Sequence, residues 1–329
     1  MCFFDTTASN TGRIKGACTL LENMLERDLL YLACRHHILE VVLRSVFDCK
    51  MGSTTGPHPD IFKRFSNAWR NLDHKKIEVG TKDKTILKHL TPQIIDVSAF
   101  LKKFKAEKQP RADYVELLQL ALLFIGNEDE SQGNVVIKAP GAISHARWMS
   151  KAIYCFKMYL FRGQFEMTES EINNLGDICV FLIRIYVKAW FNAPNASMAP
   201  NQDLGLLGSL YQYKSIDKII SEKALNKVVN HLWYLNGETV GLGFFDPTLS
   251  HDEKSGMAAK LLSSSDDTEG TKNVNIRVEV KDVPAYVREG LKKSVLTKLL
   301  LSSVDLVYKL TFCWKILKFG MPILSIRKD

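Results

Sequence analysis

The sequence predicts a predominantly helical protein in which a short α/β segment precedes a large all-helical region. Two apolar runs near the start end at Asp5 and at Cys34, and each is followed by apolar residues at helical spacing. The order strand–helix–strand–helix predicts parallel strands, because the chain returns to the same end of the sheet through a helix. From residue 60 to residue 265, apolar residues recur mainly at helical spacing, and this pattern predicts the helical region.

Composition and pattern divide the chain into four segments. Residues 1–52 are the predicted α/β segment, and a loop rich in Gly, Ser, Thr and Pro separates them from the helical region 60–265. Residues 273–283 alternate apolar and polar side chains, as in a strand with one solvated face. Residues 284–329 combine a helical pattern with many lysines, which predicts a basic amphipathic tail.

Several local signals place the ends of helices within the helical region. Thr91 before Pro92 predicts an N-cap, and capping boxes are predicted at residues 168–171 and 250–253. The tryptophans at helical apolar positions are expected in the core rather than as platforms for bases. They are Trp148, Trp190 and Trp233.

Composition excludes disordered, collagen-like and disulfide-scaffold proteins, because 46% of residues are hydrophobic and 24% are charged. The net charge of +8 suits a polyanionic partner such as DNA, or a diffuse charge that favours solubility. Seven cysteines without C-x-x-C spacing favour a reducing compartment. We find no signal peptide and no continuous apolar span, so we expect no membrane and a nuclear or cytoplasmic location.

Asp5 is the first candidate for catalysis and for metal binding. A carboxylate directly after a parallel strand lies at the carboxyl edge of the sheet, where ligands and metals bind in open α/β folds. The alternative is that Asp5 caps the loop that follows it.

The residues around Asp5 carry a resemblance to a known family. Asp5 followed by Asn10, and a next strand ending in Cys34-Arg35-His36-His37, resemble two motifs of hAT-superfamily DNA transposases. The Arg147-Trp148 pair and the run 241–247 ending in Asp-Pro are similar to later landmarks of the same family. The phrases Cys-Arg-His-His, Ala-Pro-Gly-Ala and Ala-Arg-Trp-Met also resemble an uncharacterised transposon-derived family of invertebrate genomes.

The resemblance implies that residues 1–52 are part of a ribonuclease-H-like core and that the helical region is an insertion domain. Such transposases cut DNA with two Mg²⁺ or Mn²⁺ ions held by three carboxylates. Asp5 matches the second carboxylate, the first would lie on a strand before Met1, and we find no Glu-Arg pair after Lys281 to match the third. We therefore expect an incomplete, catalytically inactive chain with no cofactor of its own, and Mg²⁺ or Mn²⁺ only if it is active.

Other interpretations remain open at this level. The chain would be an active metal-dependent transposase or nuclease if a partner chain or a fuller gene product supplied carboxylates, or if Asp5 paired with Glu238, Asp246 or Glu253. It would alternatively be a protein-interaction module without nucleic-acid binding. Cys34 and His37 admit a zinc site or a Cys–His nucleophile. The expectation for the remaining motif residues is that they brace the fold; they are Asn10, Cys34, His37, Arg147 and Trp148.

A cluster of cations is predicted at the end of one helix and in the following turn. Its members are Lys102, Lys103, Lys105, Lys108 and Arg111. They would contact phosphates in a nucleic-acid complex, or would form a solvated helix end where cations suit the helix dipole. The partners that the sequence allows are DNA and a second copy of the chain.

Overall fold

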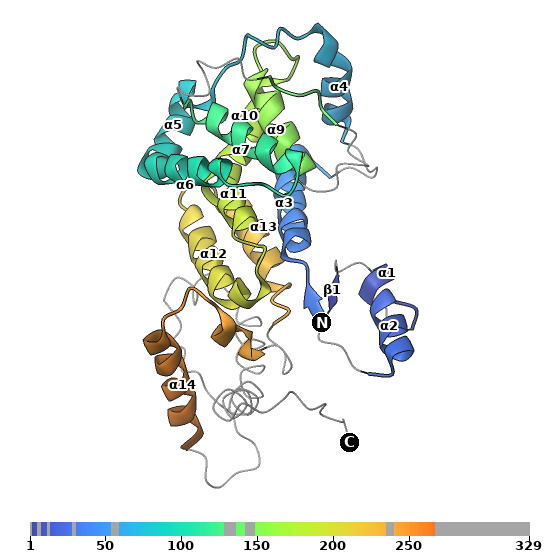
Figure 1. The fold of residues 1–329 in the computed structure, drawn as a ribbon. Helices are drawn as coiled ribbons and strands as arrows, with labels where there is room; N and C mark the ends of the chain where they lie inside the picture. The colour runs from blue at the N-terminus through green and yellow to red at the C-terminus, as the bar shows by residue number, and fades with distance from the viewer. Residues whose placement is uncertain are drawn as a thin grey trace. The chain divides into compact units, whose positions relative to one another are not determined.

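The computed structural model describes residues 2–4, 8–11, 14–27, 31–53, 59–127, 136–141, 149–234 and 240–266. These residues are predominantly helical, as the sequence predicts (Figure 1). The chain divides into two compact units. The first comprises Met1–Ile38, Ala193–Tyr211 and Val228–Asp329, and the second comprises Leu39–Asn192 and Gln212–Lys227.

The first unit begins with two short strands joined through helices. Strand β1 (Cys2–Phe4) is followed by α1 (Ala8–Thr11) and α2 (Ala17–Leu25), and the chain then enters β2 (Tyr31–Ala33). The strands pair in parallel, with Phe4 opposite Ala33, as the strand–helix–strand order predicts. Each strand is three residues long, and this pair is the whole of the β-structure in the described residues. The predicted ribonuclease-H-like α/β core is therefore not seen there.

The rest of the first unit is built from helical segments. They are η5 (Ala196–Met198), most of α12 (Ala199–Tyr213), the 3₁₀ segment η6 (Val240–Phe245) and α14 (His251–Asp266). The resemblance compared the run 241–247 with a strand-like segment of the family, but Val240–Phe245 forms the 3₁₀ helix η6 instead. The physical reason is local: glycine is depleted in strands, and this run contains Gly241 and Gly243.

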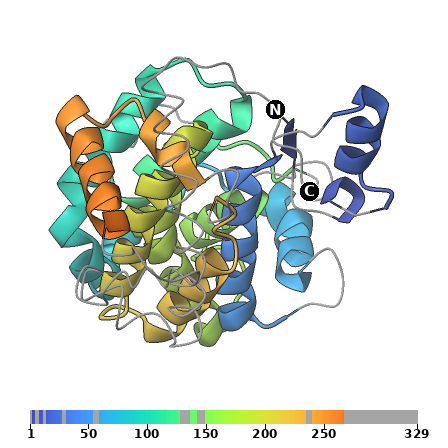
Figure 2. The same ribbon diagram turned by 90° about the horizontal axis from the view of Figure 1, so that it is seen from below.

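The second unit is an all-helical bundle (Figures 1 and 2). Its main helices are most of α3 (Arg35–Met51), α4 (Asp60–Ala68), α5 (Lys84–Leu90), α6 (Ile94–Ala106), α7 (Ala112–Phe124), α9 (Ser150–Leu160), α10 (Glu169–Phe181), α11 (Val187–Phe191) and most of α13 (Lys218–Val229). A π-helical segment, η4 (Leu182–Tyr186), joins α10 to α11 without a break. Helix α9 lies against both α7 and α10, and α6 lies against α7.

The core of this unit is apolar and rich in aromatic rings. Helix α9 is buried along almost its whole length, whereas α6 buries only Leu101. Trp190 is fully buried, which confirms its prediction as a core residue, and its ring lies 5.7 Å from that of Tyr186. Gly176 allows α10 to approach α9 closely, because a Cβ there would lie 3.2 Å from the ring of Tyr159. No helix among the described residues combines the length and the apolar character needed to cross a membrane.

Both predicted capping boxes are confirmed, and one predicted cap was wrong. Thr168 and Glu171 cap each other's backbone N–H groups at the start of α10, and Ser250 and Glu253 do so before α14. Thr91 does not cap α6. Its hydroxyl donates to the carbonyl of Leu87 at 2.7 Å, because α5 continues through η3 (Thr91–Gln93) directly into α6.

Candidate functional site

The predicted metal site lies at the carboxyl edge of the two-stranded pair. Phe4 and Ala33 are opposite each other in parallel strands, so the chain leaves β1 and β2 at the same edge. Cys34 follows β2 directly and is half-buried. Asp5, which follows β1, lies outside the described residues, and Asn10 is a half-buried residue of α1.

The Cys-Arg-His-His motif is held to the first unit through its arginine. Arg35 is buried, and its guanidinium contacts a carboxylate oxygen of Asp203 at 2.8 Å and donates to the side chain of Gln202 at 2.5 Å. Tyr234 also hydrogen-bonds the Asp203 carboxylate. Burial raises the pKa of Asp203 above its ordinary value, against the opposing influence of Arg35. The motif thus joins the start of α3 to α12.

Cys34 and His37, the residues of this motif that carried the zinc and nucleophile interpretations, are both half-buried. Within the described ranges, no hydrogen bond joins them. Across the same residues, no group of three or more His, Cys, Asp or Glu side chains is placed to hold a metal ion.

The acids considered as companions of Asp5 have structural partners where they are described. Asp246 is buried, and its carboxylate accepts hydrogen bonds from the backbone and hydroxyl of Thr248 and from Asn201. Burial raises the pKa of Asp246, but these hydrogen bonds outweigh that effect and the pKa lies below its ordinary value. Glu253 completes the capping box of α14, and Glu238 lies outside the described residues.

The predicted cation cluster lies in the C-terminal part of α6 and in the turn that follows it. Lys102, Lys103 and Lys108 are exposed, and Lys105 is half-buried. The Nζ of Lys103 lies 6.0 Å from the centre of the Phe104 ring. Arg111 is exposed but paired, because its guanidinium contacts the carboxylate of Asp113 at 2.5 Å. The exposed Lys103 and Lys108 are therefore the part of the cluster best suited to an external anion.

The backbone under these lysines is anchored to the core. The ring of Phe104 packs against Phe100 and Phe191, with ring centres 4.6 Å and 5.3 Å apart. The carbonyl of Phe104 accepts the side-chain amide of Gln109 at 2.5 Å, which holds the turn that leads to α7. These contacts fix the backbone from which the lysine side chains extend.

The Ala-Pro-Gly-Ala phrase is tethered from α9. Lys157 is buried, and its Nζ donates to the carbonyls of Lys138 and Ala139 at 2.7 Å and 3.3 Å. The same Nζ lies 2.6 Å from the carboxylate of Glu116. The hydroxyl of Tyr154 donates to the carbonyl of Gly141 at 2.8 Å. These contacts brace the segment 136–141.

The Arg147-Trp148 pair lies outside the described residues, which resume at Met149. Met149 has a left-handed backbone with φ of 59°, and α9 begins at the next residue. Its N–H donates to Oε1 of Glu40 at 2.8 Å. Burial raises the pKa of Glu40, although hydrogen bonds from Tyr186 and Met149 favour its ionised form.

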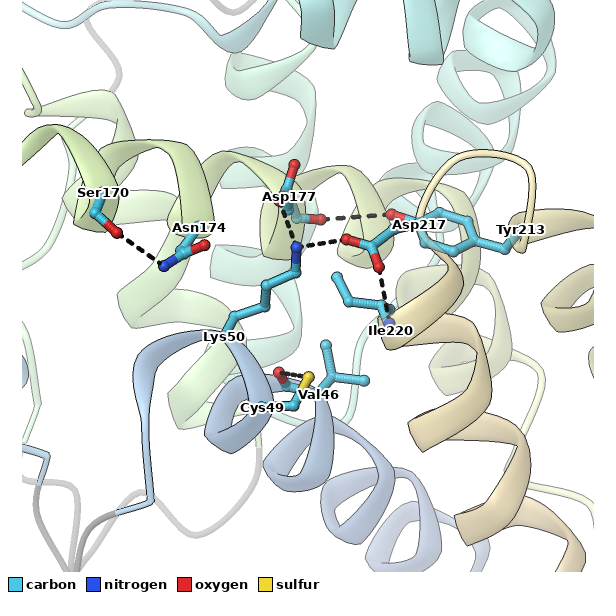
Figure 3. A network of polar contacts seen from close by, with 9 residues as sticks. All are labelled: Val46, Cys49, Lys50, Ser170, Asn174, Asp177, Tyr213, Asp217 and Ile220. Atoms are coloured by element: carbon cyan, nitrogen blue, oxygen red, sulfur yellow. Dashed lines mark hydrogen bonds and ion pairs between the residues drawn. The ribbon is translucent and has the colours of Figure 1, made fainter.

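Sequence reasoning missed Glu40, Lys157 and Lys50 as charged groups within packed helices. Lys50 lies between Asp177 and Asp217, with its Nζ 2.7 Å and 2.5 Å from their carboxylates (Figure 3). Glu40 and Lys157 each interrupt an apolar run at a position that helical spacing assigns to the interior. That interruption is a signal for a buried charge, and the partner of each residue is distant in sequence.

The chain was compared with protein-family models, with curated proteins and with solved structures, and none of these comparisons gave a match.

Proposed function

We propose that this chain is a transposon-derived, hAT-like protein without catalytic activity that binds nucleic acid nonspecifically through the lysines at the end of α6. The observation that carries the proposal is the exposure of Lys102, Lys103 and Lys108 on a helix end whose backbone is anchored by Phe104. The net charge of +8 favours the approach of a polyanion from any side.

Lysines suit this kind of binding. An ammonium on a flexible stem contacts phosphate as a point charge without reading a base, so binding is independent of sequence and depends strongly on salt. In the described residues, Lys103 and Lys108 are not engaged in ion pairs, so their charges are available to phosphate. Arg111 contributes less, because Asp113 already neutralises it.

The transposon origin is supported by the arrangement at the N-terminus. Asp5 and Cys34 each follow a strand, and the two strands pair in parallel with their ends in register. In the proposal, these strands are a remnant of a ribonuclease-H-like core, and α3 continues from the Cys-Arg-His-His motif into the helical insertion domain.

The absence of catalysis follows from the ligands that a two-metal mechanism needs. Two divalent ions together carry about four positive charges, and several carboxylates must offset this charge. Asp246 and Glu253 are held by Thr248, Asn201 and Ser250, so they are poor candidates to join Asp5.

A gel-shift titration with a mixed-sequence DNA duplex tests binding. We expect affinity to fall steeply as the salt concentration rises. The double variant Lys103→Gln/Lys108→Gln should lower the affinity, and it should also lower the slope of log affinity against log salt concentration by about two, because two fewer phosphates are neutralised. The matched control is Lys214→Gln/Lys218→Gln, which removes two exposed lysines elsewhere and should leave binding close to wild type.

The same protein incubated with DNA and Mn²⁺ tests catalysis. We expect no strand cleavage, and cleavage that disappears in Asp5→Ala would establish an active nuclease instead. No DNA binding at low salt would contradict the proposal and favour an interaction module.

A further inference from the structure

Helix α2 presents an apolar face that the other described residues of the first unit leave uncovered. Leu20 and Met24 are 55% and 81% exposed, Leu25 is 49% exposed, and Ile14, just before the helix, is 83% exposed. Helical spacing places Ala17, Leu20 and Met24 along one side, with Leu25 at its margin. None of the residues of α2 is buried. Three large apolar side chains on one short helix, with Ile14 just before it, form a surface whose contact with water is unfavourable.

The charges at the two ends of α2 oppose its own dipole. Lys15 lies at the N-terminal end, where a negative charge is favoured, and Glu22 and Glu26 lie at the C-terminal end, where a positive charge is favoured. Arg27 follows outside the helix and offsets one of the two carboxylates. A second helix in the opposite direction would turn this unfavourable arrangement into a favourable one, because it would bring a carboxylate to Lys15.

We propose that α2 is a self-association surface, on which a second copy of the chain pairs its own α2 in antiparallel orientation. A register that sets Lys15 opposite Glu26 of the second copy also sets Ala17 opposite Met24, and places Leu20 and Leu21 at the two-fold axis. Small residues then face large ones and leucines meet at the centre. Each charge contact occurs twice, since the interface is self-complementary.

The size of the surface sets the strength of the association. Helix α2 is nine residues long, or about 14 Å at 1.5 Å per residue, so it buries less than the roughly 800 Å² per partner of a stable interface. The proposal therefore predicts a reversible dimer that forms with increasing concentration.

Sedimentation velocity of the full chain from about 1 to about 100 µM tests the proposal. We expect the wild type to shift from monomer to dimer, and Leu20→Lys and Met24→Glu each to remain monomeric. Ile95→Glu is the matched control, because Ile95 is 80% exposed on α6, and this variant should dimerise as the wild type does. Circular dichroism and urea unfolding should be unchanged in all three variants.

The charge register has a sharper test. Lys15→Glu and Glu26→Lys should each weaken association about fivefold, because each introduces two like-charge contacts, and the double variant should restore it. A monomeric wild type, an unaffected Met24→Glu, or a double variant no better than the singles would overturn the proposal. A photo-crosslinker at position 24 that reacts only within its own chain, with residues 267–329, would overturn it too.

Discussion

The hydroxyl of Tyr186 donates a hydrogen bond of 2.6 Å to Oε1 of Glu40, and the same oxygen accepts the N–H of Met149. One carboxylate thereby joins three segments that are distant in sequence: α3, the π-helical segment η4 and the start of α9. Glu40 is desolvated by burial, which raises its pKa, so its neutral form is favoured in the folded protein relative to the unfolded chain.

Glu40→Gln should therefore change how stability depends on pH. A carboxyl whose pKa is raised on folding contributes stability fully below its unfolded pKa, near 4.5, and loses that contribution as pH rises through the folded pKa. Gln keeps the accepting oxygen and does not titrate. We expect Glu40→Gln to gain stability relative to wild type as pH rises above 4.5, measured by urea unfolding at a series of pH values.

Glu40→Ala is the companion variant. It leaves two buried donors without an acceptor and should cost about 2–4 kcal/mol, whereas the exposed Glu222→Ala should cost less than about 0.5 kcal/mol. Equal behaviour of the Ala and Gln variants would show that the two hydrogen bonds contribute little.

Lys157→Met should strongly destabilise the protein, because it leaves the carboxylate of Glu116 largely buried, at 15% exposure, without a cation. We expect a loss of about 3 kcal/mol in urea unfolding, and faster hydrogen exchange in residues 136–141 as the carbonyl contacts of Lys157 disappear. The double variant Lys157→Met/Glu116→Leu should recover much of the stability.

The exposed Lys138→Met is the control for Lys157→Met and should change stability by less than about 0.5 kcal/mol. A double variant as unstable as the sum of the two single variants would show that the ion pair contributes no coupling energy.

Arg35→Ala should cost more stability than any other alanine substitution in the Cys-Arg-His-His motif. The variant leaves Asp203 buried without its guanidinium and removes the contact with Gln202, so we expect a loss of about 2–4 kcal/mol. Cys34→Ala and His37→Ala should each cost about 1 kcal/mol or less, because these half-buried side chains form no such network. Denaturant unfolding of the three variants ranks them, and a reversed order would show that Cys34 or His37 braces the fold.

Lys50→Met should remove a contribution to stability that is present at neutral pH and is lost at alkaline pH. Burial lowers the pKa of Lys50, but the carboxylates of Asp177 and Asp217 outweigh it and raise the pKa above 10.5. The contribution is therefore fully present below pH 10.5 and is lost as pH rises through the folded pKa. We expect wild type to exceed Lys50→Met by about 2 kcal/mol at neutral pH and the difference to shrink above pH 10.5, in urea unfolding.

Lys63→Met is the matched control for Lys50→Met, because Lys63 forms an exposed pair with Asp60 and should show a small difference at every pH. A pH-independent gap for Lys50→Met would show that lost packing, and not the ion pairs, accounts for its effect.

The sequence by itself determined the helical class of the chain, the parallel order of β1 and β2, and both capping boxes. These features depend on neighbours a few residues apart, which periodicity and cap chemistry record. The continuation of α5 through η3 into α6 and the 3₁₀ form of Val240–Phe245 were not predicted from the local signals.

Only the tertiary structure decided which charged side chains are buried and what they contact. Glu40 meets Tyr186, Arg35 meets Asp203, and Lys157 meets Glu116, across separations of 146, 168 and 41 residues. No local pattern specifies such partners, because each pair forms only when packing brings distant helices together and removes water from both groups. The cation cluster is different: its residues were predicted from sequence, and Arg111 pairs with Asp113 only two residues away, whereas the exposure of Lys103 and Lys108 follows from the fold.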